Sequence, residues 1–299
     1  RHRFFRKGNY LPMRYGFVAC VGCGRCSRAC LPDIADPCKV MNNFSDTEKR
    51  DVAEDRFFIK KKSHEHVKGV IHVPRSATLK NKRKLAENET LFEFELDDGE
   101  SLGHHPGQFV EVSIFGIGEA PISVSSPPEK DATFELAVRR VGDVTTALFN
   151  MEPGDKVGIR GPFGNGFDLE NLEKKHILFT AAGIGMFPLR SLIKHVLKPE
   201  NRKNFKDITI LYGCKRPCEV MFMDEIEEWR KVDDVRIELT VDRCPEGECW
   251  GGCTGLITDL FPKIHLDKYD SLNTIAIVVG PPIVYKFVIK CFNFTIVCT

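Results

Sequence analysis

The hydrophobic pattern of this chain of 299 residues changes near residue 67 and again near residue 176, and the second change limits the folds that the chain can adopt. Before this point, apolar residues tend to recur at every second position in short stretches separated by turn-forming pairs such as Asp98-Gly99 and Pro153-Gly154. Alternation with a period of two is typical of half-buried strands, so we predict six antiparallel strands in a barrel or sandwich. The stretches cover residues 67–73, 90–96, 109–114, 122–126, 134–138 and 156–159.

Beyond residue 176, strand-like and helix-like stretches alternate. The apolar stretches at residues 176–180, 208–212, 235–241 and 274–279 predict strands, and residues 184–197 and 223–231 have helical spacing. Such alternation predicts a parallel α/β sheet with right-handed crossovers. The fold class is therefore predicted to be α+β and multidomain, with an antiparallel six-stranded β-barrel at residues 67–172 and an α/β parallel-sheet domain at residues 173–299.

Charge and hydropathy exclude several classes of protein. Lys and Arg together number 43 and Asp and Glu 42, and the resulting net charge of +1 gives no electrostatic basis for binding nucleic acid. The longest apolar stretch near the end of the chain, residues 275–279, is far shorter than the ~20 residues that span a bilayer. No charged region followed by an apolar one opens the sequence, so we expect no secretion signal and no membrane span.

Twelve cysteines are present, and five of them fall between Cys20 and Cys38. A secreted disulfide scaffold spreads its cysteines through a short chain, so reduced, metal-binding cysteines in a cytoplasmic protein are the better interpretation. The Cys-x2-Cys-x2-Cys-x3-Cys spacing is typical of a [4Fe–4S] cluster. A zinc site is the alternative, but zinc sites favour two separated pairs. Residues 1–66 are therefore predicted to be a ferredoxin-type iron–sulfur segment and linker, with the ligands Cys20, Cys23, Cys26 and Cys30.

There are three candidates for the fourth ligand of this cluster. In two-cluster ferredoxins the fourth cysteine of such a run serves the other cluster, so the first three need a further partner. Cys30 itself, Cys38 or a cysteine from an upstream segment fills that place. The cysteines from Cys214 onward follow no comparable spacing, and we expect no second metal site among them.

A glycine-containing turn between an apolar strand and a helix predicts a nucleotide site. Glycines there allow a pyrophosphate to approach the backbone, and a helix N-terminus offers free N–H groups and a partial positive charge. Proline suits the first helical turn, where its missing N–H costs nothing. Such turns also occur for packing alone, so the pattern is moderately specific. The candidate residues are Thr180, Gly183, Ile184, Gly185 and Pro188.

Two further segments suggest a flavin site. A hydroxyl-rich strand can place O–H and N–H donors beside a flavin ring, and its members are Pro121, Ile122, Ser123, Val124 and Ser125. An Arg-Arg pair before a Gly-x-x-Thr helix start can hold a diphosphate, and this segment contributes Val138, Arg139, Gly142, Val144 and Thr145. Read singly, each segment is more often a strand edge or a turn. Their order and spacing along the chain strengthen one another.

With these motifs, residues 67 to about 290 resemble the ferredoxin–NADP reductase superfamily, and in particular its branch of electron-transfer flavoproteins. The resemblance implies that residues 121–125 lie along the FAD isoalloxazine and that residues 142–145 bind the FAD pyrophosphate. It also implies that residues 183–189 receive the NAD(P) pyrophosphate and that Gly280 and Pro281 lie near the nicotinamide. The cysteine segment is similar to the ferredoxin-type parts of two iron–sulfur proteins that partner such flavoproteins, one from anaerobic sulfite reductase and the other the beta chain of sulfhydrogenase.

The sequence departs from that family at several positions. Ala120 stands where many members carry Arg, Ala182 replaces a frequent Gly, and Val279 replaces a Cys. The cysteine motif for a [2Fe–2S] cluster that follows in close relatives is not found after Gly280, which suggests a truncated or divergent C-terminal region. We therefore expect no [2Fe–2S] cluster in this chain.

The predicted function is that of an NAD(P)H-dependent flavin oxidoreductase that acts as an electron-transfer subunit. It would move electrons between NAD(P)H, FAD and the cluster on behalf of a partner redox subunit, such as a hydrogenase or a sulfite reductase. No side chain need act as an acid or base, so no catalytic residue is predicted, and Ser123 is the best candidate for tuning the flavin. The alternative is a non-catalytic assembly or sensor subunit with a cluster or zinc and a vestigial nucleotide fold.

Overall fold

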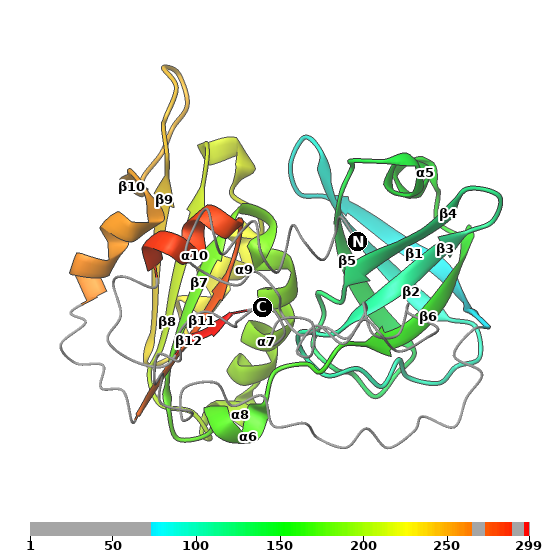
Figure 1. Ribbon diagram of the computed structural model, residues 1–299, viewed down its shortest axis with the longest axis horizontal. Coiled ribbons are helices and arrows are strands. Elements are labelled where there is room, and N and C mark those ends of the chain that lie inside the picture. The colour runs from blue at the N-terminus through cyan, green and yellow to red at the C-terminus, as the bar shows by residue number, and fades with distance from the viewer. Residues whose placement is uncertain (1–72, 265–272, 289–295, 299) are drawn as a thin grey trace, which may run out of the picture. The chain divides into compact units, whose positions relative to one another are not determined.

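The computed structural model describes residues 73–264, 273–288 and 296–298, all of which belong to the second of two compact units, Ile71–Thr299 (Figure 1). The four cysteines Cys20, Cys23, Cys26 and Cys30 lie outside the described residues. The predicted strand at residues 67–73 also lies outside them, except for Val73, which is in a bend.

An antiparallel sheet of six strands forms the first part of this unit. Its strand order is β4-β3-β6-β1-β2-β5. The outermost strands also meet, because Val124 forms an isolated antiparallel bridge with Leu136 and the Ser125 N–H donates to the Glu135 carbonyl over 2.8 Å. The sheet is thus closed into a barrel. The strands are β1 (Arg75–Lys84), β2 (Glu89–Leu96), β3 (Phe109–Ile114), β4 (Gly118–Ser123), β5 (Thr133–Arg139) and β6 (Lys156–Phe163).

Two strands of the barrel differ from the sequence prediction. The sequence pattern does not predict β1 at residues 75–84, because only Ala77 and Leu79 of this largely charged stretch are buried. β4 begins four residues before the predicted stretch at residues 122–126 and ends at Ser123, because its hairpin with β3 pairs Phe109 with Ser123. Ser125 and Ser126 therefore no longer pair with β3, and they hydrogen-bond instead to Glu135 of β5.

The second sheet is parallel throughout, with the order β10-β9-β8-β7-β11-β12. The strands predicted at residues 235–241 and 274–279 are confirmed with the same bounds. Two short edge strands of two and three residues are absent from the prediction, since so few residues carry no periodic signal. The strands are β7 (His176–Ala182), β8 (Ile208–Cys214), β9 (Val235–Val241), β10 (Cys253–Thr254), β11 (Thr274–Val279) and β12 (Ile296–Cys298).

Helices cover both faces of the parallel sheet (Figure 1). Side chains of β7 alternate, so that Ile177 and Phe179 face α7 and α9 while Leu178 faces η5 and α10. The predicted helices at residues 184–197 and 223–231 correspond to α7 and α9, each two residues shorter. The helices are α5 (Asp143–Asn150), α6 (Leu169–Leu172), α7 (Met186–Leu197), α8 (Pro199–Arg202), α9 (Met223–Trp229) and α10 (Pro282–Val288), and the 3-10 turns are η3 (Gly183–Gly185), η4 (Pro217–Glu219) and η5 (Ile257–Ile264).

The apolar core runs from the α/β part into the barrel. Leu91 of β2 and Ala137 of β5 belong to the same buried cluster as the α7 side chains Leu189 and Ile193. Burying a leucine or isoleucine side chain stabilises the fold by ~1.5–3 kcal/mol, so barrel and α/β sheet support each other. Within the described part of the chain, no helix is both long and apolar enough to span a membrane.

Candidate functional site

The predicted nucleotide turn joins β7 to α7. Gly183 has a φ of +55°, in the left-handed region that favours glycine, and it opens the turn η3 that leads into α7. The Met186 N–H, the first of α7, donates to the carbonyl oxygens of Gly183 and Ile184 in η3, and no side chain caps the N-terminus of α7. Pro188 is the third residue of α7, where a missing N–H costs nothing. The local geometry is therefore that of an anion-binding helix N-terminus.

This turn lies directly against the end of β11. A Cβ at Gly185 would lie 2.7 Å from the Val279 carbonyl carbon and closer still to its oxygen, so only glycine fits there. A Cβ at Gly280 would lie 2.9 Å from the Ala182 Cβ. The methyl group of Ala182 is accommodated because residue 280 has no side chain. The structure thus brings the predicted residues Gly183, Gly185 and Gly280 together at neighbouring strand ends.

Two observations indicate that this turn fits a nucleotide. Gly183 has open space beside its Cα, so a ligand can approach the backbone there. Thr180, at the end of β7, is fully buried, and its hydroxyl has no hydrogen-bond partner among the described residues. A buried polar atom without a partner is rare in folded proteins. Ile184 and Pro281 are exposed beside the same turn and can contact a bound group from its outer side.

The predicted flavin segment divides into an accessible and an inaccessible part. Pro121 is exposed and Ile122 and Ser123 are half-buried on β4, so these three can face a ligand. Val124 and Ser125 have 0% exposure. The Ser125 hydroxyl donates to the carbonyl oxygen of Phe187 in α7 over 2.7 Å, and it is therefore engaged within the protein.

The predicted diphosphate turn before α5 is shaped by one hydroxyl. The Thr145 Oγ1 accepts from the backbone N–H groups of Val141 and Gly142, each over 2.9 Å. This tight turn leaves the first N–H groups of α5, including that of Val144, without acceptors inside the helix. These free backbone N–H groups are better suited to bind a diphosphate than the Thr145 side chain, because the Thr145 oxygen already accepts two hydrogen bonds. Asp143 adds a negative charge in the same turn, so a cation is needed nearby.

The two neighbouring arginines before α5 have different partners. Arg139 forms an ion pair with the buried Glu89, and the preceding Val138 is in the barrel core. Arg140 is exposed, has one long hydrogen bond of 3.3 Å to Asn88, and stacks 5.7 Å from the centroid of the Phe149 ring. Arg140 is therefore better placed than Arg139 to balance the negative charge of a diphosphate. The sequence pattern contains both arginines but cannot rank them.

The five cysteines between Cys214 and Cys253 belong to no group of described ligand-type side chains that could hold a metal ion. Within residues 73–264, 273–288 and 296–298, no group of three or more His, Cys, Asp or Glu side chains could hold a metal ion. Burial raises the pKa of the Cys214 thiol to about 12, so this residue is an unreactive, protonated thiol. The described part of the chain thus offers no candidate for a second metal site.

A buried histidine beside the flavin segment makes stability depend on pH. Burial lowers the pKa of His104, whose Nε2 lies 3.0 Å from the Ser126 carbonyl oxygen. Burial likewise lowers the pKa of His195, with a contribution from Lys198. As pH falls below about 6.5, these two histidines become protonated in the unfolded chain but stay neutral in the folded chain. The free energy of unfolding therefore decreases on acidification, by at most about 1.4 kcal/mol per pH unit for each histidine.

We expect the variant His104→Gln, which retains a donor for the Ser126 carbonyl, to lose part of this dependence. The measurement is urea unfolding at a series of pH values between about 7.5 and 5.5, a range that brackets the ordinary histidine pKa, for the natural and the variant chain. Parallel curves for the two proteins would contradict the assignment to His104.

Comparison with known proteins agrees with this geometry. The oxidoreductase FAD-binding domain model matches residues 76–167, the oxidoreductase NAD-binding domain model matches residues 179–290, and a 4Fe-4S dicluster domain model matches residues 1–34. These matches identify FAD, NAD(P) and a [4Fe–4S] cluster as the cofactors. The described residues fit the first two, as the glycine turns and open helix starts show.

The chain is 34% identical to sulfhydrogenase 2 subunit gamma of Pyrococcus furiosus over 70% of its length and 74% of that protein. It is 32% identical to a probable dihydroorotate dehydrogenase B (NAD(+)) electron transfer subunit of Pyrococcus horikoshii, over 74% of its length and 75% of that protein.

Solved structures share the fold. The cytochrome b5 reductase domain of Ulva prolifera nitrate reductase superposes with a TM-score of 0.60 at 24% identity, over 76% of this chain and 97% of that one. An NADH-dependent reduced ferredoxin-NADP oxidoreductase superposes with a TM-score of 0.58 at 25% identity, over 73% of this chain and 74% of that one. Barrel, parallel sheet, glycine turns and sequence identity agree, and this chain belongs to the ferredoxin–NADP reductase family of FAD- and NAD-binding oxidoreductases.

Proposed function

We propose that this protein is the electron-transfer subunit of a larger cytoplasmic redox enzyme. In this proposal it takes electrons from NAD(P)H or delivers them to NAD(P)+, and it exchanges them with a partner subunit that carries the terminal catalytic site. The identity of 34–35% with two sulfhydrogenase gamma subunits supports a partner of the hydrogenase type, and a sulfite reductase is the other partner we propose. We further propose residues 1–66, 67–172 and 173–299 as its three domains.

The observation that carries the proposal is the arrangement of two helix starts, each preceded by glycine, in one compact unit. The β4 segment Pro121–Ser123 and the start of α5 belong to the barrel, while the turn Gly183–Gly185 and Gly280 belong to the α/β part. The Ser125 hydroxyl joins the end of the first segment to α7, the helix that follows the nucleotide turn. An FAD-binding and a nucleotide-binding segment are thereby held at a fixed separation.

The protein contributes binding, orientation and charge balance. We assign Pro121, Ile122 and Ser123 to the flavin ring, and the α5 N-terminus with Arg140 to its diphosphate. The turn at Gly183 and Gly185 and the open end of α7 are assigned to the nucleotide pyrophosphate. When bound, FAD exchanges a hydride with NAD(P)H and single electrons with the iron–sulfur cluster.

The non-catalytic alternative finds no support among the described residues. It draws on Ala182 and Val279 as signs of a degenerate nucleotide turn. The Ala182 methyl group has room because the facing residue, Gly280, has no side chain. Val279 is buried, and its carbonyl oxygen lies against Gly185. Both departures from the family pattern therefore fit an intact turn.

The test is an anaerobic titration of the purified protein with NADH and with NADPH in separate experiments. We expect flavin absorbance that is bleached by at least one nucleotide, and a broad iron–sulfur absorbance that declines with it. The nucleotide with the lower half-saturating concentration is the one that the protein prefers. A protein without flavin, or a flavin that neither nucleotide reduces, would overturn the proposal.

A further inference from the structure

Two consecutive serines after β4 connect the barrel to α7. The Ser125 hydroxyl donates to the Phe187 carbonyl oxygen over 2.7 Å, and the Ser191 hydroxyl donates to the Ser126 carbonyl oxygen over 2.6 Å. The Ser126 hydroxyl accepts from the Glu135 N–H over 3.0 Å within the barrel. The three serines are buried, so their hydrogen bonds are not exchanged for water at low cost.

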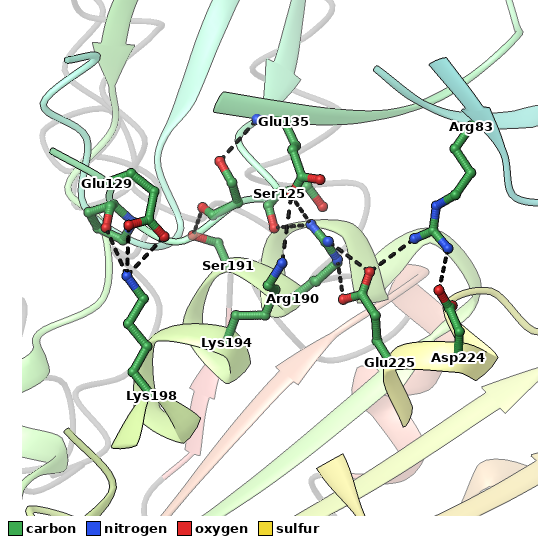
Figure 2. A network of polar contacts seen from close by, with 12 residues as sticks. Arg83, Ser125, Glu129, Glu135, Arg190, Ser191, Lys194, Lys198, Asp224 and Glu225 are labelled. Carbon is green, nitrogen blue, oxygen red and sulfur yellow. Dashed lines mark hydrogen bonds and ion pairs between the residues drawn. The ribbon is translucent and has the colours of Figure 1, made fainter. Parts of the chain in front are cut away.

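Arg190 of α7 is the centre of a charge network across the same interface (Figure 2). Its side chain is 1% exposed. Its Nη1 donates to the Ser125 carbonyl oxygen over 2.9 Å and to Glu135 of β5 over 2.7 Å. Its Nε and Nη2 groups donate to the two carboxylate oxygens of Glu225 in α9, over 2.7 and 2.8 Å. One guanidinium therefore holds the barrel, α7 and α9 together.

The charges in this network balance. Arg83 of β1 bridges Glu225 and Asp224 of α9, and Lys194 lies 3.8 Å from Glu135. With Arg190, three positive side chains face three negative ones (Figure 2). Burial alone would raise the pKa of Glu135, but the Arg190 charge and hydrogen bond, with help from Lys194, outweigh burial and lower it. The ion pairs with Arg190 and Lys194 thus favour the charged form of the Glu135 carboxylate despite its burial.

Such a network has one low-energy geometry. A guanidinium makes its hydrogen bonds in a rigid planar fork, and the oxygen partners here come from different elements. Displacing α7 along the barrel breaks several of these bonds together and leaves buried charge uncompensated, which is strongly unfavourable. The interface therefore resists sliding more than an apolar contact of the same size would.

We propose that Arg190 is a positioning residue for hydride transfer, and this inference rests on the proposed function. Ser125 lies two residues beyond the flavin candidate Ser123, and Arg190 lies five residues beyond the nucleotide candidate Gly185. The hydrogen bond from Arg190 to the Ser125 carbonyl oxygen joins the two segments directly. Hydride transfer needs reacting atoms ~3–3.5 Å apart, and a misplacement of ~1 Å can cost about a hundredfold in rate.

The test compares Arg190→Met and Arg190→Lys with a matched control, Glu129→Gln. Glu129 pairs with Lys198, the residue after α7, across the same interface, but both side chains are partly exposed and the pair adds little to stability. The first readout is the single-turnover rate of flavin reduction at saturating nucleotide. We expect a loss of about tenfold or more for Arg190→Met and a smaller one for Arg190→Lys, with nucleotide Kd changed less than about threefold.

The second readout needs neither flavin nor nucleotide. Spin labels carried on non-natural amino acids at Glu100 of the barrel side and Lys203 of the α/β side, both exposed, report the distance between the two sheets in the apoprotein. We expect a broader distance distribution in both Arg190 variants than in the natural chain or in Glu129→Gln. Arg190→Lys keeps the charge and serves as the folded variant if Arg190→Met does not accumulate.

Each result decides between positioning and a purely structural role. A slower rate with a broadened distance distribution, both absent from Glu129→Gln, supports positioning. A lower Tm with an unchanged rate below that Tm and an unchanged distribution means that Arg190 only stabilises the fold, and it overturns the inference. If the natural protein itself is not reduced by NADH or NADPH, the proposed function fails, a result distinct from failure of the Arg190 inference.

Discussion

The variant Gly185→Ala is expected to lose NAD(P)H-dependent flavin reduction almost completely. The new methyl group would lie 2.7 Å from the Val279 carbonyl carbon and closer still to its oxygen, and both are backbone atoms of β11, which pairs with β7 and β12. Neither the turn nor the strand can yield without moving the end of the parallel sheet. Overpacking of this kind costs ~1–3 kcal/mol or more. Moving the turn also displaces the α7 N-terminus to which we assign the nucleotide pyrophosphate.

Three measurements check this expectation: nucleotide Kd, the rate of flavin reduction, and the midpoint of urea unfolding. The matched control is Gly251→Ala, because Gly251 has open space around its Cα and no left-handed φ. We expect the control to behave as the natural chain in all three measurements. Normal nucleotide affinity in Gly185→Ala would show that the turn is not the nucleotide site.

Replacing Cys23 with serine is expected to remove the iron–sulfur cluster while leaving the flavin chemistry in place. Cysteine thiolates hold such clusters and a hydroxyl is a poor substitute, so we expect this variant to lose its cluster. The FAD and nucleotide segments belong to a separate compact unit, Ile71–Thr299, so flavin reduction by NAD(P)H should persist. Electron delivery to the partner subunit should then cease.

The measurements are iron and sulfide content, the broad iron–sulfur absorbance, and flavin bleaching by nucleotide. Cys218→Ser is the control, since Cys218 is exposed and belongs to no group that could hold a metal among the described residues. We expect this control to retain its iron. Zinc in place of iron in the natural protein would contradict the cluster assignment, and unchanged iron in Cys23→Ser would exclude Cys23 as a ligand.

Local patterns are sufficient for much of the fold. The stretches at residues 109–114, 235–241 and 274–279 are predicted with the bounds that the structure has, because each is a short run of apolar residues between clear breaks. The nucleotide turn is also visible locally, since a glycine in the left-handed region and a helix start are properties of neighbouring residues.

Strand register depends on partners far away in the sequence. Half of the ten residues of β1 are charged, and its two buried side chains are identified only by the strands β2 and β6 on either side. Both bounds of β4 are set by its pairing with β3. This pairing starts the strand four residues before the predicted stretch and ends it at Ser123. A hydroxyl-rich stretch by itself does not reveal where the sheet ends.

The sequence by itself determined the order of the domains, the cysteine run, the glycine turns and the family, because these depend on residues within a few positions of one another. Only the tertiary structure decided what Ser125 and Arg190 do. The partners of Arg190 lie 35, 55 and 65 residues away along the chain, and in the sequence it is an ordinary arginine in an amphipathic helix. Its burial and its role follow from charges that meet only when the barrel packs on α7, since electrostatic compensation acts through space and leaves no periodic signal.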